Sequence, residues 1–219
     1  MHRKLQTPII YLITNGETNL QTTPASQDFL QILRLIESAV SAGIDLVQIR
    51  EKNLNSRVLF QLAASASQIS KGSQTRVLVN DRVDIATAAG ADGVHLTTRS
   101  LPAEVVRQTF GAEILIGVST HSLPEAAVAR EQSADFVVFG PVFETPGKDR
   151  YGEGAGLPEL KRVTGALAGF PVLALGGVNV ERSKASFEAG AQGVAAIRMF
   201  NDPAQLKKTV AAIKENFSQ

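Results

Sequence analysis

The chain has 219 residues with 44% hydrophobic content and a formal net charge of +1, from 22 basic and 21 acidic side chains. A net charge this small excludes a whole-protein field that attracts nucleic acid or an anionic membrane, so any anion must bind at a local site. The lack of cysteine excludes disulfides and thiolate chemistry and fits a cytoplasmic protein. No apolar run reaches the roughly 18 residues needed to cross a bilayer, and the start MHRKLQTPIIYLIT predicts a first strand rather than a signal peptide.

Short β-branched apolar runs alternate with longer stretches of helical period along the chain. The runs predict strands at Ile9–Thr14, Leu46–Arg50, Val77–Asn80, Gly93–Leu96, Leu115–Val118, Phe136–Phe139, Val172–Leu175 and Gly193–Ile197. The stretches predict helices at Asp28–Ala42, Ser56–Ser70, Val83–Ala89, Pro102–Thr109, Leu123–Gln132, Pro158–Leu167, Glu181–Ala189 and Pro203–Phe217. Eight strand–helix units without a leftover segment predict one α/β domain over residues 1–219, closed into a (β/α)8 barrel.

Four recurrent phrases favour the barrel over an open doubly wound sheet. They read AGIDLVQIR, AGADGVHL, SADFVVFG and AGAQGVAAI, and each places a small-residue helix end just before a buried strand. The phrases show only weak internal similarity and do not form a solenoid repeat.

The longest irregular segment is Gly140–Gly156, GPVFETPGKDRYGEGAG. A loop of this length inside a compact domain is usually a lid or a binding loop, although a tolerated surface insertion remains the alternative.

Polar residues gather at the expected carboxyl ends of the strands, where barrels of this type build their active sites. After the second strand, Gln48, Arg50 and Lys52 occupy every second position, so we expect their side chains to point to the same side. An amide, a guanidinium and an ammonium group together suit the oxygens of a phosphate or pyrophosphate. The alternative is a strand end with solvated charges.

Further candidates follow the third, fourth and fifth strands. Asn80 and Asp81 suit Mg²⁺ and its waters, or else the N-cap of a helix that begins near Val83. His95 is expected to point into the barrel interior as a structural residue, whereas His121 lies in a loop and is the better acid–base candidate.

A second anion-binding set follows the last two strands. Gly176 and Gly177 end the seventh strand, and Arg198 follows the eighth. Glycines let backbone N–H groups approach an anion, and loops at these two places bind phosphate in many barrels. The sequence therefore predicts two anion-binding sets at one barrel mouth.

At these residues the sequence resembles the thiamine-phosphate synthase and thiazole tautomerase family, along nearly the whole chain. The motifs that carry the resemblance are VQIREK (47–52), VNDRVDIA (79–86), GADGVHL (90–96), GVSTHS (117–122), FGPVFETPGK (139–148) and LALGG (173–177). Together they are specific for the superfamily and less so for the reaction.

The resemblance implies a transferase of thiamine biosynthesis that couples hydroxymethylpyrimidine pyrophosphate with thiazole phosphate. Pyrophosphate leaves with the help of Mg²⁺, and the thiazole nitrogen captures the pyrimidine-methyl cation. By resemblance, Gln48, Arg50, Lys52, Asn80 and Lys148 contact the pyrophosphate, Asp81 binds the metal, Ser119 and Thr145 line the substrates, and Gly176, Gly177, Ile197 and Arg198 hold the thiazole phosphate. The candidate catalytic residues are Lys52, Ser119, His121 and Lys148.

The chain departs from the family after the fourth strand. Synthases carry a second Mg²⁺-binding aspartate there, whereas this chain reads Thr97-Thr98-Arg99-Ser100. The alternatives are therefore a tautomerase that aromatises thiazole phosphate with His121 as acid–base, and a non-catalytic thiazole-phosphate binder. We favour the synthase, because the Gln48, Arg50 and Lys52 set costs desolvation and charge repulsion unless an anion uses it. The sequence leaves open whether the chain forms a homo-oligomer.

Overall fold

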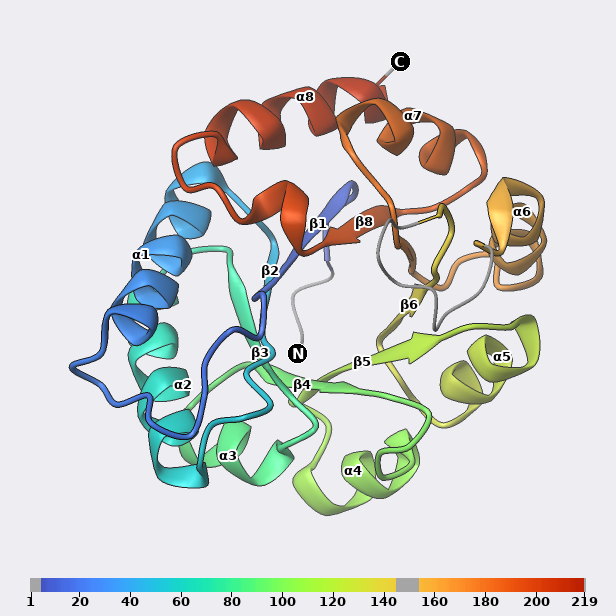
Figure 1. Ribbon diagram of the computed structural model, residues 1–219. Coiled ribbons are helices and arrows are strands. Elements are labelled where there is room, and N and C mark those ends of the chain that lie inside the picture. Colours follow the sequence, from blue (N-terminus) through green and yellow to red (C-terminus); the bar gives the residue numbers. More distant parts are fainter. Residues whose placement is uncertain (1–4, 145–153, 219) are drawn as a thin grey trace.

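The computed structural model describes residues 5–144 and 154–218. In this part of the chain, eight parallel strands form a closed barrel in the order β1 to β8 (Figure 1). The strands are β1 Ile9–Ile13, β2 Leu46–Ile49, β3 Arg76–Asn80, β4 Gly93–Leu96, β5 Leu115–Thr120, β6 Phe136–Phe139, β7 Val172–Leu175 and β8 Gly193–Ala196. The helices are α1 Gln27–Ala42, α2 Ser56–Ser70, α3 Val83–Ala88, α4 Ala103–Phe110, α5 Leu123–Glu131, α6 Gly156–Ala166, α7 Val180–Glu188 and α8 Leu206–Ser218.

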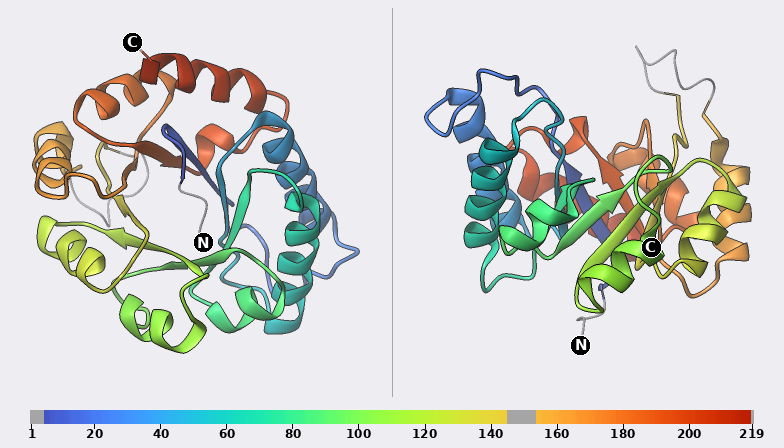
Figure 2. Two further views of the ribbon diagram at one scale, coloured as in Figure 1. Left: turned by 180° about the vertical axis from the view of Figure 1, so that it is seen from behind. Right: turned by 90° about the horizontal axis from the view of Figure 1, so that it is seen from below.

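The helices surround the strands on all sides, as both the axial and the side views show (Figure 2). The ring closes where β1 pairs with β8, with Ile9 opposite Gly193 and Leu12 opposite Ala196. The (β/α)8 barrel predicted from the sequence is confirmed. No helix in the described residues is both long and apolar enough to span a membrane.

Two predicted boundaries differ from the structure in ways that matter below. Strand β5 continues through Ser119 and Thr120, because these residues pair with Val138 and Phe139 of β6. The last helix begins at Leu206 and not at Pro203, since residues 202–205 form a turn in which the Asp202 carboxylate accepts the Ala204 N–H at 3.0 Å. A 3-10 helix, η2 (Arg198–Phe200), also follows β8 and was not predicted.

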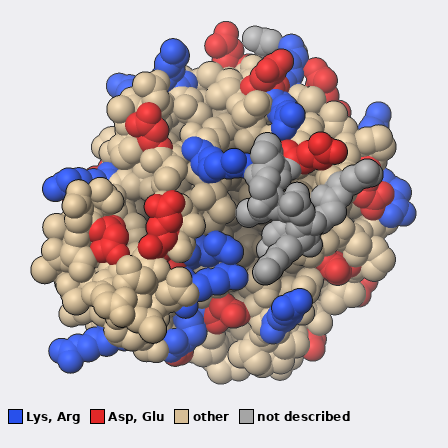
Figure 3. Space-filling model, viewed as in Figure 1, with Lys and Arg blue, Asp and Glu red and all other residues tan. Residues whose placement is uncertain are grey.

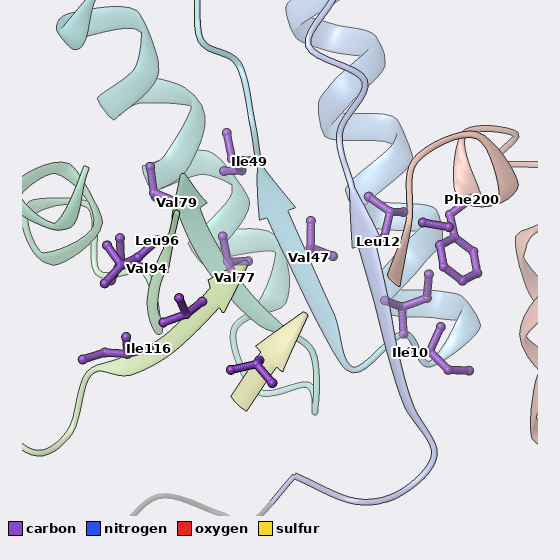
Figure 4. Packing of buried hydrophobic residues seen from close by; sticks show 14 of the residues in the cluster. Ile10, Leu12, Val47, Ile49, Val77, Val79, Val94, Leu96, Ile116 and Phe200 are labelled. Carbon is purple, nitrogen blue, oxygen red and sulfur yellow. The ribbon is translucent and has the colours of Figure 1, made fainter. Parts of the chain in front are cut away.

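The buried core divides into two clusters because side chains alternate along each strand. Outward-facing residues such as Ile10, Val47 and Val77 pack against the helices (Figure 4). Inward-facing residues such as Tyr11 and Phe136 fill the barrel interior. The interior is therefore a packed core, and a ligand must bind at the mouth of the barrel.

The four recurrent phrases of the sequence fold into the same helix end. In each, one residue adopts the left-handed conformation, and the next residue donates its N–H to the carbonyl five positions earlier, as in a Schellman motif. The left-handed residues are Gly43, Gly90, Ser133 and Gly190, with φ of 73°, 67°, 65° and 90°. The device turns the chain sharply from the end of a helix into the next strand.

The polar residue that follows each turn ties neighbouring strands together through its side chain. Its oxygen accepts a backbone N–H from the preceding strand at 2.6–2.8 Å. We call these four contacts the strand clamps; they are Asp45 to Ile10, Asp92 to Val77, Asp135 to Ile116 and Gln192 to Val172. The clamps join β1 to β2, β3 to β4, β5 to β6 and β7 to β8, so the barrel is built from four equivalent strand pairs.

Replacing Ser133 with glycine should stabilise the protein by about 1 kcal/mol, because a side chain in the left-handed region is strained. The equivalent positions Gly43, Gly90 and Gly190 already carry glycine. The matched control is Gly43→Ser, which should destabilise by a similar amount, since the added Cβ meets only the flexible end of Lys214. Urea unfolding of both variants measures the difference, and a loss of stability in Ser133→Gly would contradict the assignment.

Asp45→Ala should lower the free energy of unfolding by about 1–3 kcal/mol, because it leaves the buried Ile10 N–H without an acceptor. Asp45→Asn keeps an acceptor, as the amide of Gln192 does in the fourth clamp.

The pH dependence of the Asn variant follows from the charge that it removes. Burial raises the pKa of the Asp45 carboxyl, partly offset by the Ile10 N–H and the Lys214 charge. A raised folded-state pKa means that stability is lost as the pH rises through it. Asp45→Asn should therefore match the wild type at low pH and exceed it at neutral pH in urea unfolding; the opposite trend would refute this account.

Candidate functional site

The loops that follow the strands form one face of the molecule, and basic side chains gather around a hollow near its centre (Figure 3). This is the end at which barrels of this type carry their active sites. Of the predicted site residues, Thr145 and Lys148 lie outside the described residues. The others are all at this end of the barrel.

Gln48 and Asn80 meet at the rim between β2 and β3. The Gln48 amide nitrogen donates to the Asn80 side-chain oxygen at 3.0 Å, and the Gln48 side chain is buried. Because its oxygen is engaged, Asn80 presents its NH₂ group as a donor. Asn80 is thereby suited to an anion rather than to a cation.

Arg50 and Lys52 lie beyond the end of β2, in the loop to α2. The Arg50 N–H donates to Thr14 Oγ1 at 2.9 Å, and its guanidinium is close enough to His95 to influence the pKa of that imidazole. The predicted shared side is thus supported for Gln48 and Arg50. Lys52 is exposed in the same loop.

Glu51 has a supporting role that the sequence analysis missed. Its buried carboxylate accepts the Gly16 N–H at 3.1 Å and the Thr18 hydroxyl at 2.7 Å. These bonds fasten the β1–α1 loop to the end of β2, beside Arg50. The sequence shows only an acidic residue between two basic ones, and its need for nearby donors becomes evident once the fold buries it.

Asp81 follows β3 with φ of 64°, in the left-handed region that few non-glycine residues adopt. Its N–H donates to the His95 carbonyl at 2.9 Å, so the strained backbone is anchored to β4. The alternative prediction, that Asn80 or Asp81 caps α3, is wrong. The N-cap residue is Arg82, and no side chain caps this helix. Strain at an exposed carboxylate is typical of a functional position.

His95 points into the barrel, as predicted. Its ring bonds Tyr11 OH at Nδ1 (3.1 Å) and Ser119 Oγ at Nε2 (2.8 Å). Burial, and secondarily the Arg50 charge, lowers the pKa of His95 to about 3. The imidazole is therefore neutral, and it supports Ser119, which is half-buried at the mouth.

His121 lies in the loop after β5. Its ring Nδ1 bonds the Gly140 carbonyl, which can only accept, so Nδ1 carries the proton and Nε2 is the basic nitrogen. The backbone N–H donates to Glu125 at 2.6 Å, within the cap of α5. These two bonds fix the orientation of the His121 ring in the loop.

The loop after β7 carries backbone donors. The Gly176 carbonyl accepts the Phe143 N–H at 3.0 Å, and the Gly177 carbonyl accepts Arg182 Nη1 at 2.8 Å. In a trans peptide the N–H points opposite to the carbonyl, so the N–H groups of Gly177 and Val178 point away from these partners. Neither N–H has an acceptor among the described residues.

Glycine is required at both positions of this turn. A Cβ on Gly176 would lie 2.5 Å from Pro141, and one on Gly177 would lie 2.6 Å from the Glu144 carbonyl oxygen. Arg182, a residue that the sequence analysis missed, also stacks over the Phe143 ring at 5.0 Å. The turn is thus held between α7 and the first residues of the β6–α6 loop.

Ile197 and Arg198 follow β8 directly and open the 3-10 helix η2, with Arg198 exposed. They lie next to the β7 turn in the ring, because β7 and β8 are paired. The second predicted anion-binding set is therefore brought together by the fold.

A metal site made of protein groups alone is not present in the described residues, where no three His, Asp or Glu side chains gather suitably. Asp81 is the exposed carboxylate at the mouth beside the Gln48–Asn80 pair. The arrangement fits a cation that takes most of its ligands from substrate and water.

Comparisons with known proteins point the same way. The family model described as "Thiamine monophosphate synthase" matches residues 10–200. A Geobacter sulfurreducens relative is 46% identical over 166 residues, 76% of this chain and 78% of the relative. The thiamine-phosphate synthase of Clostridium novyi is 37% identical over 181 residues, 81% of this chain and 88% of its own. The solved thiamine phosphate pyrophosphorylase of Pyrococcus furiosus has a TM-score of 0.79 at 26% identity, with 96% of each chain covered.

Arg182→Met should weaken the binding of inorganic phosphate about three- to tenfold, because it removes the donor that orients the Gly177–Val178 peptide, and one hydrogen bond contributes about 1 kcal/mol. The measurement is a phosphate titration that follows the amide NMR signals of Gly177 and Val178. Arg162→Met is the matched control, since Arg162 is an exposed arginine on α6 paired with Glu159. Equal weakening in both variants would show an effect of net charge alone.

Proposed function

Because the chain belongs to the thiamine monophosphate synthase family, we propose that it is a thiamine-phosphate synthase, a transferase that joins hydroxymethylpyrimidine pyrophosphate to thiazole phosphate. The observation that carries the proposal is the pair of donor sets at one mouth. The first set consists of Gln48, Arg50, Lys52 and Asn80, and the second consists of the amides of Gly177 and Val178. Two phosphorylated substrates need two such sets.

The first set suits the pyrophosphate leaving group. The bond from the methylene carbon to the pyrophosphate oxygen breaks, and the electron pair stays with the oxygen. The thiazole nitrogen then forms the new bond to that carbon. Charge accumulates on the leaving oxygens, so the NH₂ of Asn80 and the cations of Arg50 and Lys52 stabilise the transition state more than the ground state.

The second set suits the thiazole phosphate. The Gly177 and Val178 N–H groups, which have no acceptor in the described part of the chain, can bind phosphate oxygens, and Arg198 supplies a cation from the adjacent loop. Binding at this place holds the thiazole ring on the side of the mouth away from β3. The nucleophile and the electrophile are then positioned without any side chain acting as a base.

Mg²⁺ is part of the proposal, and Asp81 is the residue that would hold it. The exposed Asp81 carboxylate has a fixed, strained backbone and lies beside the donors for pyrophosphate. Mg²⁺ commonly binds through one or two carboxylates, substrate phosphates and water. When bound, it neutralises charge on the pyrophosphate. A site in which Asp81 is the one protein carboxylate would bind Mg²⁺ more weakly than a site with two.

The tautomerase alternative is not favoured, because similar proteins such as those of Clostridium novyi and Pyrococcus furiosus are thiamine-phosphate synthases. The grouping of Gln48 with Asn80 at the mouth also supports a pyrophosphate site. We place the reaction in the cytoplasm, in keeping with the cysteine-free composition.

Incubation with both substrates and Mg²⁺ should yield thiamine phosphate and pyrophosphate in equal amounts. Asp81→Asn should raise the Mg²⁺ concentration needed for half-maximal rate about tenfold or more, because asparagine tolerates the left-handed backbone but lacks the charge. Lys52→Met should lower kcat/KM about tenfold or more, since bonds to charged groups contribute about 1.5–3 kcal/mol.

The control for Asp81→Asn is Asp84→Asn, which removes an exposed carboxylate paired with Arg82 on α3. It should leave the Mg²⁺ requirement unchanged. Absence of thiamine phosphate in the wild-type reaction, together with conversion of the non-aromatic thiazole tautomer, would replace this proposal with the isomerase.

A further inference from the structure

A chain of three polar groups runs from the centre of the barrel to its mouth, and the proposed chemistry leaves its inner two members unused. It joins Tyr11 OH to His95 Nδ1, and His95 Nε2 to Ser119 Oγ. We propose that Tyr11 and His95 are positioning residues that orient the Ser119 hydroxyl, so that its proton is directed into the mouth and donates a hydrogen bond to bound substrate. The kinetic effect of this arrangement rests on the proposed function, whereas the direction of the hydrogen bonds does not.

The three residues come from β1, β4 and β5, and the fold makes room for their contact. Tyr11 is fully buried and His95 nearly so, among inward-facing residues. A Cβ at Gly117 would lie 2.8 Å from His95 Nδ1 and 2.3 Å from the Phe136 ring. Glycine at this position therefore lets the imidazole sit in line between Tyr11 and Ser119.

The direction of the chain follows from counting donors and acceptors. In the first arrangement, Tyr11 donates to Nδ1, Nε2–H donates to Ser119, and the Ser119 proton is free at the mouth. In the second, Nδ1–H donates to Tyr11 and Ser119 donates to Nε2. The second arrangement leaves the buried Tyr11 proton without an acceptor, because Tyr11 OH has no other partner in the described residues.

An unmatched buried donor disfavours the second arrangement by roughly tenfold or more. In the first arrangement every buried proton has a partner, and the one free proton is on Ser119, which is half-buried at the mouth. The first arrangement therefore dominates.

The protonation states agree with this direction. Burial raises the pKa of the Tyr11 phenol, so it keeps its proton. Burial, with the nearby Arg50 charge, lowers the pKa of His95 to about 3, so the ring is neutral and has one donor and one acceptor. Across the neutral pH range, neither group changes the direction of the chain.

The consequence for the site concerns selectivity. A Ser119 oxygen that already accepts from His95, and whose proton points into the mouth, matches an acceptor atom of the substrate, such as a phosphate oxygen or an unprotonated ring nitrogen. It cannot accept a proton from the substrate through His95, because the accepting nitrogen of that ring is occupied by Tyr11. Ser119 is thus a donor in the site and not part of a base relay.

The first test needs no substrate. Nitrogen NMR of the full-length protein should show His95 protonated at Nε2 and unprotonated at Nδ1 throughout the neutral range, with the signals assigned by comparison with His95→Gln. Tyr11→Phe, which removes one oxygen with little change of shape, should release this preference and let the Nδ1-protonated form appear. A wild-type His95 protonated at Nδ1 would overturn the proposal.

The second test is kinetic. Tyr11→Phe should lower kcat/KM about five- to tenfold with the protein still folded, and Ser119→Ala should lower it at least as much. If Tyr11 acts through Ser119, Tyr11→Phe should cause no further loss in the Ser119→Ala background; multiplicative losses would overturn the proposal. Thr120→Val is the control, since it removes the neighbouring hydroxyl, which is buried without a partner in the described residues, and should leave kcat/KM unchanged. A wild-type protein without synthase activity would refute the proposed function, while the NMR result would still decide the direction of the chain.

Discussion

The four strand clamps are the interaction on which the rest of the structure depends. Each places a carboxylate or amide oxygen on a backbone N–H of the preceding strand, directly after a left-handed helix end. They set the register of the strand pairs at the amino ends, where backbone groups of a parallel barrel would otherwise lose partners. Because the clamps fix the strand register at the amino ends, the residues at the carboxyl ends are not needed for register and can serve in binding.

Two features at the mouth of the barrel lower the stability of the free protein. Asp81 holds a strained backbone, and the Gly177 and Val178 amides have no acceptors among the described residues. Both features cost stability in the free protein, and both become favourable when an anion and its cation arrive. Stability and function are therefore placed at opposite ends of the same strands.

Most of the fold could be predicted from sequence because barrel strands are buried on both faces and read as short apolar runs. The exceptions depend on tertiary contacts. Ser119 looks like a loop residue until β6 is seen to pair with it. Glu51 accepts the Gly16 N–H from a loop 35 residues away, and Arg182 donates to the Gly177 carbonyl just before its own helix. Neither partner can be identified from the sequence, because both contacts depend on how the loops fold. The strand-end positions of the candidate site residues could be predicted from the alternating pattern, whereas the direction of their hydrogen bonds depends on the fold.

The strand clamps also divide the barrel into modules. Each clamp lies inside one two-strand unit, so the connections between units, such as residues 71–74 between α2 and β3 or residues 111–113 between α4 and β5, cross no clamp. A chain reopened at such a connection and rejoined elsewhere would keep every clamp. The barrel therefore consists of four two-strand units, each with its own clamp. A break or a duplication between two units leaves the strand register within each unit unchanged.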